Sequence, residues 1–131
     1  MSHTVCIIQD MAHSSESGGE LVESLRLELH RGSLALAVMS ALQGEQYGYT
    51  LRNSLSERGT EIDEGALYPL LCRLESQGLL TSQWREKDRR KKRFYRLSSE
   101  GKRTLKLLLA EWLLMNSSLK QILQEYSDGP C

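Results

Sequence analysis

The sequence contains little cysteine or histidine. Of its 131 residues, three are cysteines and three are histidines. Cys6, Cys72 and Cys131 lack zinc-ligand spacing, and their odd number does not favour a disulfide framework. The histidines all lie within the first 30 residues, where none pairs with a cysteine at a zinc-like interval. We therefore expect no metal site.

Catalytic motifs and long apolar runs are also missing. The sequence has no glycine-rich phosphate loop, HExxH or CxxC motif. A nucleophile needs a nearby base, and the histidines are confined to the N-terminal end. We expect no catalytic residue, no cofactor and no enzyme activity.

Apolar runs such as Leu107 to Ala110 are too short to cross a bilayer, and the apolar segment Val5–Ile8 does not resemble a signal peptide. We expect no membrane partner and a cytoplasmic location.

The net charge is zero, but the charges are unevenly distributed. Residues 1–30 carry five acids and one base, and residues 31–84 carry six acids and four bases. Residues 85–96 instead carry eight bases and two acids. Such a local basic run in an otherwise acidic chain predicts one anion-binding site, whereas most charge runs are simply solvated loops.

The N-terminal part alternates between polar and helical patterns. Residues 1–19 end in SSESGG and are expected to form a flexible extension. From Glu20, leucines at steps of four predict a short helix that ends near Gly32. Ser33 then caps a nearly all-apolar helix that ends at Gly44 and belongs at the centre of the core.

Two further helices precede the basic run. The first covers roughly residues 47–58, and Asp63 or Glu64 caps the second, which ends at Gly78. Within this second helix, Leu67 and its neighbours at helical spacing form the apolar face. The apolar face consists of Leu67, Leu70, Leu71 and Leu74.

The segments LLTSQWR and KRFYRLS both alternate as strands, and the polar turn EKDRRK joins them as a hairpin with a basic tip. A long final helix follows from Ser99 to about Glu125. The fold class expected is mostly α with a small β-hairpin, in the order of a winged helix-turn-helix. The expected organisation is a flexible extension (1–19), a winged helix-turn-helix DNA-binding domain (20–98), a C-terminal dimerisation helix (99–126) and a tail (127–131).

Three ordered motifs resemble those of the PadR family of winged-helix transcription regulators. GALYPLLCRLESQGLL, residues 65–80, resembles the family's recognition-helix signature, although Cys72 stands where a polar or charged residue is expected. YGYTL at 47–51 resembles the opening of its second helix. RFYRLSSEGKRTL at 93–105 resembles its second wing strand and final helix. The similarity covers residues 31 to 115, approximately.

The resemblance implies that double-stranded DNA is the partner and that the helix beginning near Gly65 enters the major groove. Gly65 and Ala66 would let the backbone approach closely, and Tyr68 would contact DNA unless it is only packed against the preceding helix. Tyr47 would meet the phosphate backbone unless it serves only the core. The wing cations, with Arg89 and Arg90 as minor-groove candidates, would neutralise phosphates. They are Lys87, Arg89, Arg90, Lys91, Lys92 and Arg93.

The final helix predicts a homodimer. Apolar residues recur on it at alternating steps of four and three, as at a coiled-coil seam. The helix would be roughly 40 Å long at 1.5 Å per residue, more than a small domain covers, so a partner helix is expected unless the final helix packs only on the first helix of its own chain. Asn116 would set the register between two such helices. The seam consists of Leu105, Leu109, Trp112, Asn116, Leu119 and Leu123.

These observations leave three functional hypotheses. The first is a repressor that binds a near-palindromic promoter site as a homodimer. The second adds a small aromatic effector at Trp112, since a tryptophan on the last helix lines a ligand pore in some family members. The third is a winged-helix module whose basic wing binds an acidic protein. Short members with an N-terminal extension include a cyanobacterial regulator of clock period, so a circadian clock gene is one expected target.

Overall fold

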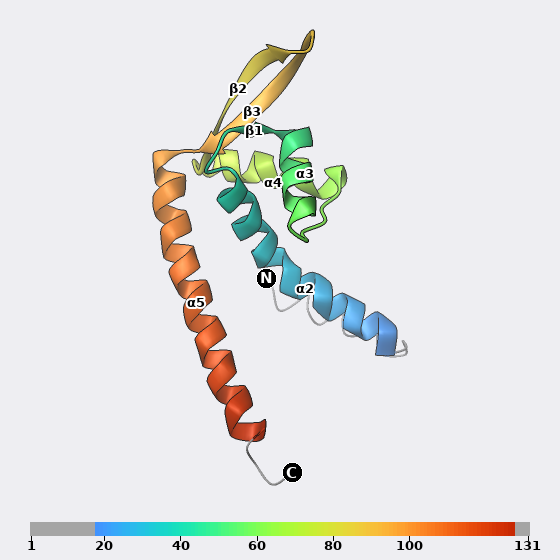
Figure 1. Ribbon diagram of the computed structural model, residues 1–131, viewed down its shortest axis with the longest axis vertical. Coiled ribbons are helices and arrows are strands. Elements are labelled where there is room, and N and C mark those ends of the chain that lie inside the picture. Colours follow the sequence, from blue (N-terminus) through green and yellow to red (C-terminus); the bar gives the residue numbers. More distant parts are fainter. Residues whose placement is uncertain (1–17, 128–131) are drawn as a thin grey trace. The chain divides into compact units, whose positions relative to one another are not determined.

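The computed structural model describes residues 18–127 (Figure 1). The expected extension, residues 1–19, lies outside the described residues except for Gly18 and Gly19, which begin a helix. The expected tail likewise lies outside them, apart from Ser127. The chain divides into two compact units, residues 1–34 and 35–131.

Helix α2 (Gly18–Ala41) begins in the first unit, and the expected break at Gly32 is wrong. The hydroxyl of Ser33 donates to the carbonyl of Leu29 at 3.2 Å, the bond that a serine makes inside a helix rather than at its N-cap. A glycine within a helix costs only about 1 kcal/mol. Gly32 therefore does not end α2. Leu21 and Leu25 of the first unit are exposed.

The second unit has an apolar core. The last residues of α2, helices α3 (Gly48–Glu57) and α4 (Glu64–Ser76), a small sheet and the start of α5 (Ser99–Ser127) contribute to it. Val38 and Met39 at the end of α2 are buried, as expected for its apolar segment. The full set is Val38, Met39, Leu42, Leu51, Leu55, Leu67, Leu71, Leu74, Leu80, Tyr95, Leu97 and Leu105.

Helix α4 has the expected caps. A side-chain oxygen of Asp63 accepts a hydrogen bond from the backbone N–H of Ala66 at 2.8 Å, so Asp63 is the N-cap. Beyond the C-cap, Gly78 has a φ of +81°, a conformation that glycine adopts at little cost. The chain thereby turns directly from α4 into the first strand of the hairpin.

The sheet has three antiparallel strands in the order β1-β3-β2. Strands β2 (Leu80–Lys87) and β3 (Arg90–Leu97) form the expected hairpin, but β1 (Gln46–Tyr47) was not expected. The predicted six-residue turn was also too long. Only Asp88 and Arg89 connect the strands, both with positive φ (55° and 68°), as in a type I′ turn. Such a turn suits the twist of the strands, so charged residues on both sides continue the ladder.

Helix α5 starts next to the end of α4. The hydroxyl of Ser98 accepts from the backbone N–H of Gly101 at 2.9 Å and donates to the carbonyl of Gly78 at 2.6 Å. The expected fold class is confirmed: the layout is a mostly helical winged helix with a small sheet and a long C-terminal helix. The β2–β3 hairpin projects beyond the helices as a wing (Figure 1). None of the helices within residues 18–127 has the length and apolar character needed to cross a membrane.

Candidate nucleic-acid interface

A groove of about 550 Å³ lies between the start of α3, the exposed face of α4 and the wing. Aromatic side chains from β1, α4 and β2 line it together with cations of β3. Both tyrosines expected to contact DNA therefore share one surface with part of the basic run. The residues that line the groove include Tyr47, Tyr68, Trp84, Lys91, Lys92 and Arg93.

Tyr68 lies over the first residue of α3. A Cβ at Gly48 would be 2.1 Å from the Tyr68 hydroxyl oxygen, so the close approach requires a glycine there. Tyr68 nevertheless remains 43% exposed. The ring therefore packs against the second helix of the motif and also presents a surface to a ligand.

Tyr47 contacts residues of both wing strands. It is the N-cap residue of α3, and its backbone N–H donates to the hydroxyl of Thr50 at 3.2 Å. Its ring centroid lies 5.1 Å from that of Phe94 on β3. The ammonium groups of Lys92 and Lys87 lie 4.9 and 5.5 Å from the same ring, within cation–π distance. Tyr47 thus lies with wing lysines where a phosphate would be neutralised.

Gly65 and Ala66 lie in the first turn of α4, the end that would meet DNA first. A Cβ at Gly65 would meet only the Asp63 Oδ1 atom, at 3.4 Å. In the same turn, Glu64 pairs with Arg52 at 3.1 Å. That pair offsets an acid that would otherwise repel phosphates.

Acidic residues from outside the basic run bind two of its cations. Arg85 forms a two-bond ion pair with Glu45 (2.5 and 2.6 Å) and lies 5.0 Å above the Phe94 ring. Arg93 pairs with Glu75 of α4 at 3.0 Å. Among the described residues, the other cations predicted to bind DNA form no ion pair with an acid. They are Lys87, Arg89, Arg90, Lys91 and Lys92.

Trp84, which lines the groove, and Glu75, which contacts the groove residue Arg93, were not predicted to be site residues. Trp84 is 63% exposed on β2, with the Arg93 guanidinium 5.7 Å from its ring. Side chains of a strand alternate between its two faces, so Trp84 and Leu80, four residues apart, lie on the same face. Because Leu80 is buried against the helices, this spacing could have placed Trp84 on the helix-facing side of the hairpin. Glu75 gave no comparable signal, because its partners lie 7 and 18 residues further along the chain.

Two further titratable groups lie beside the groove. Cys72 is a free, exposed thiol on α4. Burial raises the pKa of the Tyr95 hydroxyl, although the nearby Arg93 guanidinium opposes that shift. Within residues 18–127, no group of three or more potential metal ligands occurs.

The predicted seam on α5 is divided between core and surface. Leu105 is buried in the core of the chain itself, and Leu109 packs against that core. From Trp112 onward the large apolar side chains are exposed, and the amide of Asn116 donates to the carbonyl of Trp112 at 3.0 Å. Of the predicted seam, Trp112, Asn116, Leu119 and Leu123 therefore remain exposed for contact with a partner.

Comparison with known proteins places this geometry in a defined family. The model of the PadR-like family of transcriptional regulators matches residues 36–107. A transcriptional regulator of Mycobacterium tuberculosis is 38% identical over 79 residues, covering 60% of this chain and 74% of that protein.

Solved structures agree with this match. A PadR family transcriptional regulator from Eggerthella lenta is 40% identical, with a TM-score of 0.74, covering 80% of this chain and 94% of its own. One from Clostridium difficile is 28% identical, with a TM-score of 0.63, covering 68% and 96%.

Proposed function

Since the chain belongs to the PadR-like family of transcriptional regulators, we propose that it binds a specific promoter site through the groove between α4 and the wing. Family membership confirms that the chain is a DNA-binding regulator rather than an enzyme. The observation that supports our assignment of the surface is the convergence of Tyr47, Tyr68 and the wing lysines on one groove. We place its action in the cytoplasm.

In this proposal the first turn of α4 enters the major groove. Gly65 and Ala66 allow close approach, and Tyr68 extends the contact surface toward the DNA. The unpaired wing cations bind phosphates, with Arg89 and Arg90 at the tip reaching the minor groove. Phosphate contacts orient the protein, and the contacts of α4 with base edges give the sequence preference.

We further propose that the regulator acts as a symmetric homodimer. The exposed apolar residues of α5 from Trp112 onward would bury each other against a second copy. Two recognition helices would then match a near-palindromic site, and occupancy of a promoter would repress it. A circadian clock gene as the target is supported only by the likeness to a clock-period regulator.

Fluorescence-anisotropy titration of the chain against genomic duplex fragments across a salt series tests DNA binding. If each protomer makes three to five phosphate contacts, the dimer makes roughly six to ten. Log affinity should then fall with log salt at a slope of about −5 to −9. Arg89→Ala/Arg90→Ala should flatten this slope. Lys106→Ala/Lys120→Ala removes the same charge from exposed positions on α5 and should leave it nearly unchanged. Weak binding that responds neither to salt nor to the wing variant would exclude the proposal and favour the acidic-protein partner.

Oligomeric state tests the role of α5. Analytical ultracentrifugation should find a dimer, and Asn116→Leu should alter its register, its stability or its stoichiometry. An Asn116→Leu variant with unchanged oligomeric state and stability would remove Asn116 from the proposal. A monomer at micromolar concentration would remove the dimer.

An aromatic effector at Trp112 is the second candidate. Trp112 is 48% exposed, yet it lines neither the groove described above nor the hollow beside Glu45, so a second copy would have to complete the site. Planar aromatic compounds should quench tryptophan fluorescence in the wild type. The quenching should disappear in Trp112→Ala, whose remaining emission comes from Trp84.

A further inference from the structure

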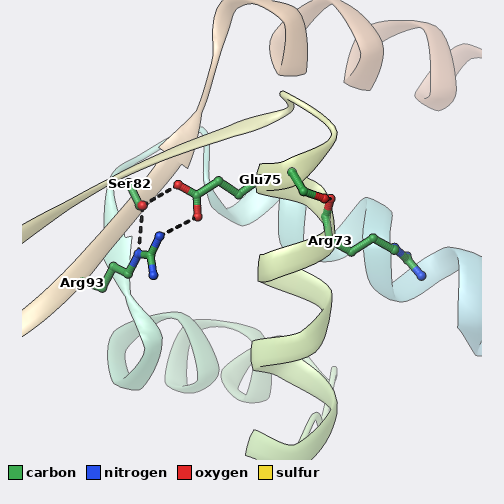
Figure 2. Close-up of polar contacts among 5 residues, drawn as sticks. Arg73, Glu75, Ser82 and Arg93 are labelled. Atoms are coloured by element: carbon green, nitrogen blue, oxygen red, sulfur yellow. Dashed lines mark hydrogen bonds and ion pairs between the residues drawn. The ribbon is translucent and has the colours of Figure 1, made fainter.

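Three side chains join α4 to both strands of the wing. One carboxylate oxygen of Glu75 accepts from the Ser82 hydroxyl at 2.6 Å, and the other accepts from the Arg93 guanidinium at 3.0 Å. The Nε–H of Arg93 also donates to the Ser82 oxygen at 2.9 Å. Figure 2 shows the closed ring of contacts that results. We call Glu75, Ser82 and Arg93 the α4–wing link.

The α4–wing link uses the side of α4 that faces the hairpin. Arg73, two residues before Glu75, points away from it in Figure 2. The ring of Trp84, which is directly opposite Arg93 in the strand register, is 5.7 Å from the Arg93 guanidinium. Trp84 and Arg93 both line the groove, so the link borders it.

Stability alone does not explain an acid at this position. The side chains of Arg93 and Glu75 are 39% and 28% exposed, and ion pairs so accessible to water contribute little to folding. A carboxylate next to a phosphate-binding surface also repels DNA. A role in orienting the wing accounts for both facts.

We propose that Glu75 is a positioning residue that fixes the wing to the recognition helix, so that both read one DNA site. This inference rests on the proposed DNA-binding function. Arg93 then acts through Glu75 and Ser82, and its predicted phosphate contact is secondary. An untethered wing still attracts phosphates, but it must be ordered on binding, which lowers the preference for the correct site.

The test uses the full chain and two fluorescein-labelled 30-base-pair duplexes. One is selected by the wild-type chain from a randomised pool, and the other is a scrambled duplex of the same composition. Glu75→Gln removes one negative charge and nearly preserves shape. Glu86→Gln is the matched control, because it removes one negative charge from an exposed position on the wing.

The expected result is a loss of discrimination. Ordering a long side chain on binding costs about 0.5–1.5 kcal/mol, so the ratio of the two affinities should fall about twofold to thirteenfold in Glu75→Gln. Affinity for the scrambled duplex should stay the same or rise, because a repulsive charge is gone and Arg93 is released. In Glu86→Gln the ratio should stay unchanged.

Arg93→Lys provides a second, charge-conserving test. Lysine retains the positive charge but lacks the guanidinium fork that reaches Glu75 and Ser82 together. If Arg93 positions the wing, Arg93→Lys should lose discrimination as Glu75→Gln does. If Arg93 is only a phosphate contact, Arg93→Lys should match the wild type.

The outcomes separate the two proposals. A wild-type chain that selects no duplex overturns the DNA-binding proposal and this inference with it. A wild-type chain that binds its selected duplex, while Glu75→Gln discriminates as well as Glu86→Gln, overturns only the positioning role. Thermal unfolding by circular dichroism accompanies each variant, because general unfolding would weaken binding to both duplexes equally. If Glu75→Gln unfolds, the Arg93→Lys ratio decides the question.

Discussion

Gly48→Ala should weaken DNA binding with little effect on stability, because Gly48 makes room for Tyr68. The added Cβ would lie 2.1 Å from the Tyr68 hydroxyl oxygen and 2.9 Å from its Cζ atom. To restore an ordinary contact distance of 3.4 Å, the hydroxyl must move by about 1.3 Å. The clash is with the end of a side chain, so the ring can move without moving the backbone.

The position of Tyr68 determines how the effect of Gly48→Ala is divided between folding stability and DNA affinity. Because Tyr68 is 43% exposed, its ring can turn toward water, and the free energy of unfolding should fall by no more than about 1 kcal/mol, the low end for overpacking. A displaced ring, however, enters the groove that DNA would occupy. A poorly placed tyrosine at the centre of an interface costs about 1.4 kcal/mol or more, which is about a tenfold loss of affinity.

Urea unfolding and anisotropy titration measure the two effects separately. Gly44→Ala is the matched control, since a Cβ there would meet nothing within 4 Å and Gly44 does not line the groove. In the Gly48→Ala/Tyr68→Ala double variant the methyl group has no ring to displace, so its affinity should equal that of Tyr68→Ala alone. Gly48 does not act through Tyr68 if Gly48→Ala binds DNA like the wild type, or if the substitution weakens binding equally with and without Tyr68.

Three further substitutions test other parts of the structure. Gly101→Ala places a Cβ 2.0 Å from the carbonyl oxygen of Leu79, which is backbone and cannot turn aside, so thermal unfolding should show a loss of about 1–3 kcal/mol or more. Arg89→Gly relieves a φ of +68° and should stabilise the hairpin by about 1 kcal/mol, while reducing the salt slope by about 0.9 per protomer. Burial raises the pKa of Tyr95, so the folded chain binds its phenolic proton more tightly than the unfolded chain does; unfolding free energy should decline as pH rises above about 10, and Tyr95→Phe should remove that part of the decline in urea titrations.

Local patterns were enough to predict most helices and the hairpin. Asp63 and Gly78 carry cap chemistry that depends only on neighbouring residues, and both occupy the expected positions. Gly32 and Ser33 looked like the end and start of two helices, but the helix continues through both. A glycine costs a helix only about 1 kcal/mol, and a serine inside a helix can donate to the carbonyl four residues earlier, as Ser33 does, so neither residue alone marks a boundary.

The missed strand has a similar explanation. Gln46 and Tyr47 are too few to show a two-residue alternation, and they form β1 only because β3 supplies the partner backbone. Tyr47 consequently joins a sheet at the point where it caps α3, which brings its ring against Phe94 and the wing lysines. Its place in the chain indicated a role at the helix start but not the contact with the wing.

Charge counting in the sequence could not distinguish free cations from paired ones. Glu45 and Glu75, which lie outside the basic run, bind Arg85 and Arg93. Five of the six cations predicted to bind phosphate then remain unpaired per protomer, and ten in the proposed dimer would give a salt slope of at most about −9. A measured slope steeper than this limit would mean that another cation of the run reaches phosphate: Arg96, which forms no ion pair in the described part of the chain, or Arg85 or Arg93 after leaving its acid. Repeating the salt series with Glu75→Gln tests Arg93. A slope steepened by more than about 1 shows that Glu75 kept Arg93 from phosphate in the wild type. An unchanged slope shows that Arg93 does not reach DNA even when it is free.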